Sequence, residues 1–104
     1  MSTIALLNDS LRRTFTGGKV VMTEGGAALG EQELAQVLER VRTSEFTNDN
    51  DPHGEHDFGN FVVGGVTYLF KVDYYAPDME GGSEDPADPE KTTRVLTIMR
   101  ADEY

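Results

Sequence analysis

Apolar residues in the first 43 positions recur three or four residues apart, which is the spacing of one face of an α-helix. Two such stripes are present, formed by Ile4, Leu7, Leu11 and Phe15 and by Leu34, Val37, Leu38 and Val41. The first stripe predicts an amphipathic helix that starts at the N-cap residues Ser2 and Thr3 and ends at a glycine pair. This helix is expected to carry Arg12 and Arg13 on its solvent side. The second stripe predicts a helix from about residue 30 to residue 43.

From residue 58 onward the period changes to two, which is the alternation of a strand with one buried face. Segments 58–63 and 66–75 flank Gly64-Gly65, a pair that tolerates the positive φ angles of a tight hairpin turn. In segment 66–75 the even-numbered residues are apolar and are expected to face the helices, whereas the odd-numbered face is expected to be wet. Two more strands are predicted, over the β-branched run 19–23 and over 94–100.

The elements follow in the order α-β-α-β-β-β, which predicts an α+β fold. We expect an antiparallel sheet of about four strands with the two helices on one face. A single domain spanning residues 1–104 is expected, because a chain of this length buries about 65% of its unfolded surface in one core. Two segments lie outside the periodic pattern, an acidic loop at 45–57 and another at 76–90. A connection as long as the second is typically either functional or mobile.

Acidic residues are concentrated in one part of the chain. Residues 45–90 hold twelve Asp and Glu residues and one base, Lys71, so this segment has a net charge of −11 while the whole chain has −10. The flanking segments are therefore nearly balanced. A one-sided field of this kind attracts cations or basic protein surfaces and repels nucleic acid, so direct binding of nucleic acid is disfavoured.

Several classes of site and location are excluded or disfavoured by the composition. The chain has no cysteine, which excludes disulfides, thiolate metal sites and a cysteine nucleophile. No apolar run reaches the roughly 20 residues of a membrane span, and the first residues show no signal peptide. We therefore expect a cytoplasmic protein without membrane contact. No phosphate-binding loop or nucleophile-elbow motif is present, and no cofactor is predicted.

The segment from Asn48 to Gly59 contains both histidines of the chain and four carboxylates. His53, His56 and Asp57 are candidate ligands for Zn²⁺, Mn²⁺ or Fe²⁺ in a small metalloenzyme. Their spacing is not that of a helical zinc motif, and Asp and Asn in such a loop commonly bond to nearby backbone N–H groups instead. A structured loop, a metal site and a general acid–base role for the histidines all remain open.

Four segments make the chain similar to a known family: 8–15, 48–59, 71–75 and 94–104, of which the most specific part is His53-Gly54-Glu55-His56-Asp57-Phe58-Gly59. Through them the chain resembles the short bacterial proteins called domain of unknown function 3768, which are frequent on alphaproteobacterial plasmids and other mobile elements. The resemblance implies no activity, because none is established for the family. It implies a setting in which small acidic proteins often inhibit host defence. Arg100 departs from the family pattern, where an apolar residue often stands, and this affects the last strand rather than the acidic face.

Charge and resemblance together favour a non-enzymatic binding protein that inhibits a host CRISPR or restriction complex as a mimic of DNA. It would present carboxylates to the basic, nucleic-acid-binding surface of that complex. The expected contacts are Asp49, Asp51, Glu55, Asp57, Asp73, Asp78, Glu80, Glu84, Asp85, Asp88 and Glu90. Each exposed ion pair contributes only about 0.2–1 kcal/mol, so affinity would come from the array. The alternatives are the small metalloenzyme already described and an acidic antitoxin or assembly partner of a basic protein.

Overall fold

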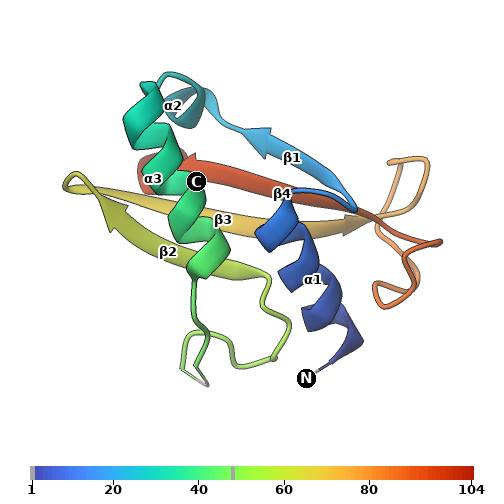
Figure 1. The fold of residues 1–104 in the computed structure, drawn as a ribbon. Coiled ribbons are helices and arrows are strands. Elements are labelled where there is room, and N and C mark those ends of the chain that lie inside the picture. Colours follow the sequence, from blue (N-terminus) through green and yellow to red (C-terminus); the bar gives the residue numbers. More distant parts are fainter. Residues whose placement is uncertain (1, 48) are drawn as a thin grey trace.

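The computed structural model describes residues 2–47 and 49–104, so Met1 and Asn48, the first residue of the histidine-containing segment, lie outside the described residues. One four-stranded sheet has the order β1-β4-β3-β2, with strands β1 (Lys19–Met22), β2 (Phe58–Val63), β3 (Val66–Tyr75) and β4 (Thr93–Arg100). Helices α1 (Thr3–Thr14) and α3 (Glu31–Thr43) cover one face of the sheet (Figure 1). A single helical turn, α2 (Glu24–Ala27), precedes α3, and a 3₁₀ turn, η1 (Ala101–Glu103), follows β4. The predicted α+β class, with two main helices and four strands, is confirmed.

The sheet is mixed, so the prediction of a purely antiparallel sheet is wrong in one pairing. β2 with β3 and β3 with β4 are antiparallel, but β1 runs parallel to β4, with Lys19 opposite Val95. Side-chain alternation indicates that a strand has a buried face but carries no information on the direction of its neighbour. No turn joins β1 to β4, and the chain between them passes through both α3 and the hairpin, so nothing local in the sequence sets their orientation.

The hairpin has the predicted bounds, whereas other element ends differ by a few residues. Gly64 and Gly65 both adopt positive φ angles, +59° and +80°, as a two-residue hairpin turn requires. α1 ends earlier than predicted, because Phe15 takes a left-handed conformation and donates its N–H to the carbonyl of Leu11. The turn α2 was not predicted, since four residues are too few to show a helical period. No helix in the described part of the chain is long and apolar enough to cross a bilayer.

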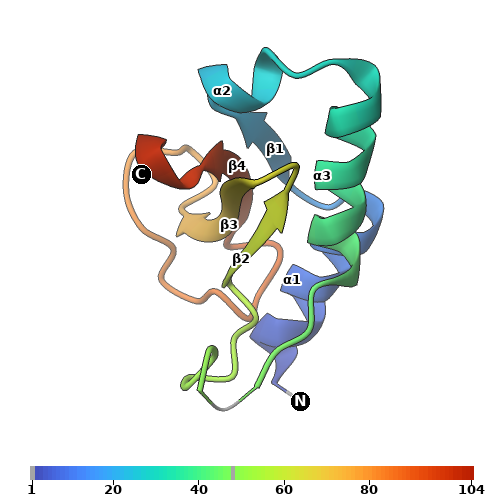
Figure 2. The same cartoon turned by 90° about the vertical axis from the view of Figure 1, so that its left-hand side faces the viewer.

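The apolar core lies between the sheet and the two helices. It is formed by Leu11, Val37, Val41, Phe61, Val63, Tyr68, Phe70, Val72, Leu96 and Ile98. The opposite face is not uniformly wet, which corrects the prediction at Leu69. Leu69 lies opposite Met99 in the register of β3 and β4, and both are at most 6% exposed. Figure 2 shows η1 on this second face, and the ring of Tyr104 contacts that of Phe58 edge-on.

Candidate functional site

The second acidic loop, residues 76–90, is held by hydrogen bonds of its own. The N–H of Ser83 donates to the carbonyl of Tyr74 at 3.0 Å, and that of Ala76 donates to Gly81 at 2.7 Å. Three aspartates each accept the N–H of the residue two positions further on: Asp78 from Glu80, Asp85 from Ala87 and Asp88 from Glu90, at 2.9–3.2 Å. These turns fix the carboxylates relative to the backbone, so this acidic loop has a defined shape.

The carboxylates of this loop lie at the surface. Asp78, Glu80, Glu84, Asp85 and Glu90 are exposed, and Asp88 is half-buried. Among the described residues, Glu84 alone of these six has a cationic partner, with Nζ of Lys91 3.7 Å away. Most of the negative charge of the loop is therefore not neutralised within the molecule.

Arg94 of β4 connects this loop to helix α1. Its side chain is buried, its Nε donates to Oδ1 of Asn8 at 2.9 Å, and its Nη2 donates to the carbonyl of Pro86. The guanidinium lies over the ring of Tyr74, 5.3 Å from the centroid. Burial lowers the pKa of Arg94 from its ordinary value, against a smaller opposing effect of Tyr74. A cation from the sheet thus holds the backbone of the second acidic loop.

Asn8 and Tyr74 extend the same network to the first acidic loop, residues 45–57. Nδ2 of Asn8 donates to the carbonyl of Glu55 at 3.0 Å and to the hydroxyl of Tyr74 at 2.8 Å. The Tyr74 hydroxyl in turn donates to Oε1 of Glu55 at 3.0 Å. Burial, followed by the charges of Asp57 and Glu55, raises the pKa of Tyr74, so the phenol stays protonated and remains a donor. Both acidic loops are therefore anchored to one polar cluster beside α1, and Figure 1 shows them on either side of that helix.

His56 fixes the first acidic loop from within. It has a positive φ of +56°, and its ring stacks on that of Phe46 with the centroids 4.2 Å apart. Nδ1 lies 2.9 Å from Oδ1 of Asp9, and Nε2 lies 3.5 Å from Oδ2 of Asp51. Asp51 also accepts the backbone N–H of His56 at 3.2 Å, and its side chain is 7% exposed. The imidazole is therefore held between two carboxylates.

Arg12 is buried, so the prediction that it faces solvent is wrong. It is 1% exposed; Nη1 donates to the carbonyls of Val41 and Arg42 at 2.8 and 2.7 Å, and Nη2 donates to Oδ1 of Asp9 at 2.8 Å. The carbonyls at the end of a helix have no partner within it, so Arg12 completes the C-terminus of α3. Burial acts to raise the pKa of Asp9, but hydrogen bonds and charges from Arg12 and His56 outweigh it and lower this pKa below its ordinary value.

The structure divides the eleven predicted contact residues into three groups. Asp49 and the six acids of the second loop lie at the surface or half-buried beside it, and Asp73 is paired with Lys71 at 2.9 Å. Asp51, Glu55 and Asp57 are half-buried in the first loop, where Asp51 and Glu55 have the internal partners described above. Burial and the nearby carboxylates of Glu55 and Asp51 raise the pKa of Asp57. The exposed array is thus centred on the second loop.

The candidate metal ligands are not brought together. His53 is exposed, whereas both ring nitrogens of His56 face aspartates. In residues 2–47 and 49–104 no group of three His, Asp or Glu side chains is arranged to hold a metal ion.

Sequence reasoning missed the residues that anchor both loops: Asn8, Arg12 and Arg94. One signal was available for the first two. Ala5, Asn8, Asp9 and Arg12 have the i, i+3, i+4, i+7 spacing of a single helical face, and this face is the one that α1 buries. The same spacing also describes the solvent face of an ordinary amphipathic helix, so it groups these residues on one face without showing that the face is buried. Nothing in the local sequence of Arg94 distinguishes it from an exposed strand residue.

Comparison with known proteins gives one family. The model described as "Protein of unknown function (DUF3768)" matches residues 22–103. No curated protein and no solved structure matches the chain.

Proposed function

The chain belongs to this family of proteins of unknown function, and because that description names no activity, we propose a function from charge and geometry. The protein inhibits a host defence complex, of CRISPR or restriction type, by occupying the basic surface on which the complex binds nucleic acid. It acts as a non-enzymatic mimic of the nucleic-acid backbone. It is encoded on a mobile element and acts in the cytoplasm, where such complexes meet DNA.

The observation that carries this proposal is the surface array of carboxylates on a loop of defined shape. A mimic of a phosphate backbone must present its charges at fixed positions, because a flexible loop would lose conformational entropy on binding. The aspartate turns and the Arg94 anchor supply that order without neutralising the carboxylates. Basic grooves that bind DNA are lined with Lys and Arg, which pair with carboxylates as they do with phosphates.

Salt dependence of binding tests the proposal. A defence complex is first captured from cells that carry nuclease-based defences and is then titrated calorimetrically with the protein over a range of salt concentrations. We expect affinity to fall steeply with salt and DNA to compete with the protein, since many screened ion pairs make the contact.

A pair of matched variants locates the contact surface. Glu80→Gln combined with Glu90→Gln removes two exposed carboxylates from the second acidic loop, and we call it the loop variant. Glu31→Gln combined with Glu33→Gln removes two from the first turn of α3, and we call it the helix control. The loop variant is expected to slow association and to flatten the salt response, while the helix control binds like the native protein. A flat salt response of the native protein, or a ternary complex with DNA, would contradict the proposal; the ternary complex would favour an assembly partner instead.

A further inference from the structure

The free edge of β2 differs in chemistry from the rest of the surface. Residues 58–70 contain no charged side chain, although charged residues make up 27% of the chain. β2 lies at the edge of the sheet, and its register with β3 is continuous, without a bulge. Natural proteins usually block such an edge with a charge, a proline or a bulge, because its free N–H and C=O groups pair readily with another strand. β2 itself has none of these devices, and among the described residues the one charged side chain that bonds to its edge is Arg40 of α3, at Val62.

Three residues of β2 direct their backbone groups away from β3. In an antiparallel pair, successive residues bond alternately to the neighbour and to the outside. Val63 and Val66 close the two-residue turn, so Phe58, Asn60 and Val62 are the outward residues. The carbonyl of Val62 agrees with this assignment, because it accepts a hydrogen bond from Nη1 of Arg40 at 3.2 Å. In the described part of the chain, the other outward groups have no protein hydrogen-bond partner.

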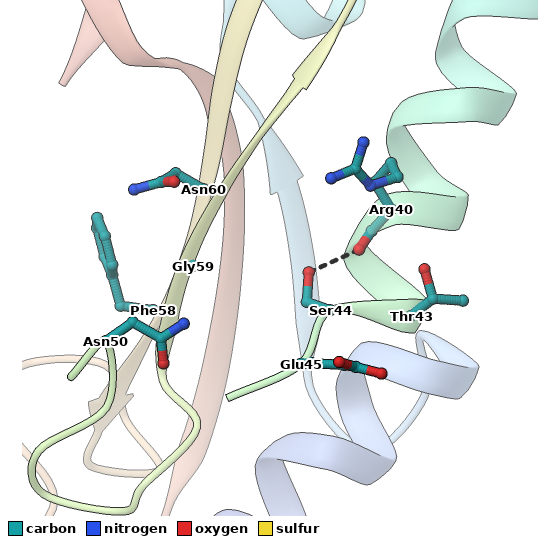
Figure 3. A pocket seen from close by; sticks show the side chains of 8 residues that line it. All are labelled: Arg40, Thr43, Ser44, Glu45, Asn50, Phe58, Gly59 and Asn60. Carbon is teal, nitrogen blue, oxygen red and sulfur yellow. Dashed lines mark hydrogen bonds between the residues drawn. The ribbon is translucent and has the colours of Figure 1, made fainter. Parts of the chain in front are cut away.

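Two pockets border this edge, and Glu45 and Asn50 of the first acidic loop also line the first of them. A pocket of about 500 Å³ lies between the Phe58 half of β2 and the end of α3, and Arg40 and Thr43 are on its helical side (Figure 3). The side chains of Phe58 and Asn60 project away from α3 in this view. A second pocket of about 470 Å³ continues past Val62 and shares Arg40 with the first. A further strand therefore has room beside β2.

The other edge of the sheet, formed by β1, is not a long uncharged strand as β2 is. β1 is four residues long, begins with Lys19 and pairs in parallel with β4. A short edge strand with a lysine is one of the usual ways of blocking strand addition. The two edges thus serve as an internal comparison.

We propose that β2 pairs with β2 of a second copy of this chain, antiparallel and around a two-fold axis, so that two sheets become one. Asn60 then faces Asn60 of the second copy, and Phe58 faces Val62, which gives every outward backbone group a partner. Arg40 leaves the Val62 carbonyl as the second strand enters.

A second copy fits this edge because the strand is self-complementary around Asn60. Two chains of net charge −10 repel each other over most of their surface, so their pairing must use an uncharged face such as this edge. Glu39 and Arg40 are adjacent on α3 and both border the second pocket. Neighbouring opposite charges can be self-complementary around a two-fold axis, so the pairing predicts that Glu39 of one copy lies near Arg40 of the other. This inference does not depend on the proposed function.

Sedimentation equilibrium of the native protein and two lysine variants tests the pairing. Val62→Lys and Val21→Lys each place a lysine at an exposed valine of an edge strand, where the native side chains are 54% and 46% exposed. We expect native dimers, a dissociation constant raised at least about tenfold by Val62→Lys, and no change with Val21→Lys. A native protein that stays monomeric at all concentrations, or an equal response of the two variants, would overturn the proposal.

A cysteine placed at the two-fold axis gives a second test. The native chain has no cysteine, so Asn60→Cys introduces a single thiol that faces its own copy within the Cα separation that a disulfide requires. We expect a disulfide-linked dimer after mild oxidation. Thr67→Cys is the control, because Thr67 is exposed on β3 and lies one strand away from the edge. Equal cross-linking of both variants, or none in Asn60→Cys, contradicts the β2 interface.

Discussion

Two buried arginines join separate elements of the molecule through polar contacts. Arg12 joins α1 to the end of α3, and Arg94 joins β4 to both α1 and the second acidic loop. For the Arg12–Asp9 ion pair, removing one partner leaves an uncompensated buried charge and costs about 3–5 kcal/mol. Arg94 is held by neutral acceptors, the Asn8 side chain and the Pro86 carbonyl. The arrangement of the surface carboxylates therefore depends on single residues that lie outside both acidic loops.

The contribution of the Asp9 charge to the free energy of unfolding can be measured by varying the pH. Because its pKa is lower in the folded protein than the ordinary 3.8, its ionised form stabilises the native state above about pH 4, and this contribution is lost as the pH falls through the folded value. Asp9→Asn removes the contribution at every pH and leaves Arg12 without its anion. We expect urea unfolding to show a deficit of about 3–5 kcal/mol at neutral pH, shrinking below about pH 4.

Asp49→Asn is the matched control for this measurement, since Asp49 is an exposed aspartate of the first acidic loop. It is expected to change the free energy of unfolding by no more than about 0.5 kcal/mol at neutral pH. A deficit of Asp9→Asn that stays constant down to pH 2 would show that its loss of stability does not come from the charge of Asp9.

At the scale of elements, the sequence predicts what local pattern determines. The period of two and the glycine pair predict the β2–β3 hairpin at its observed bounds, and the helical stripes predict α1 and α3. The parallel pairing of β1 with β4 could not be predicted, because it depends on contacts between segments far apart in the chain.

In the candidate site, too, the sequence predicts only what local pattern determines. Composition alone predicts the acidic loop at 76–90. The internal partners of the first loop lie much further away in sequence: Asn8 bonds to Glu55 across 47 positions and to Tyr74 across 66. Arg12 is the instructive error, because an arginine next to an apolar stripe is normally solvated. The i, i+3, i+4, i+7 spacing places Ala5, Asn8, Asp9 and Arg12 on one face of α1, but the burial of that face depends on the distant carbonyls of Val41 and Arg42 that Arg12 binds.

Gly59 provides a test at the scale of elements, because the lack of a side chain at this residue lets β2 pack closely against the core ring of Phe70 in β3. A Cβ at Gly59 would lie 2.6 Å from the ring of Phe70, its direct neighbour in β3 and a fully buried core residue. Gly59→Ala therefore forces the ring to move, and we expect a loss of about 1–3 kcal/mol in chemical denaturation. Gly81→Ala is the control, since its Cβ would meet nothing within 4 Å. Similar stability of the two variants would mean that the core adjusts around Phe70 without strain.

At the scale of the whole molecule, the second acidic loop and the uncharged hairpin tip lie apart. The Gly64-Gly65 tip of the hairpin lies at the opposite end of the sheet from the second acidic loop (Figure 1). One chain thus has room for two different contacts, an anionic one with a basic partner and a β2 pairing with a second copy. A dimer built through β2 would present two acidic loops to one target and gain avidity if both engage.

The exposed carboxylates should also destabilise the native state, because like charges in the compact protein repel each other. We expect the loop variant to raise the free energy of unfolding by up to about 0.5 kcal/mol at low salt and to reduce the stabilising effect of added salt. The helix control should have the opposite sign, since Glu31 and Glu33 lie in the first turn of α3, where negative charge stabilises a helix. Urea unfolding at low and high salt measures both. A loop variant that is less stable than the native protein at low salt would mean that the carboxylates of Glu80 and Glu90 make attractive contacts within the fold. Such carboxylates would not be free to contact a partner, which would contradict their place in the proposed binding surface.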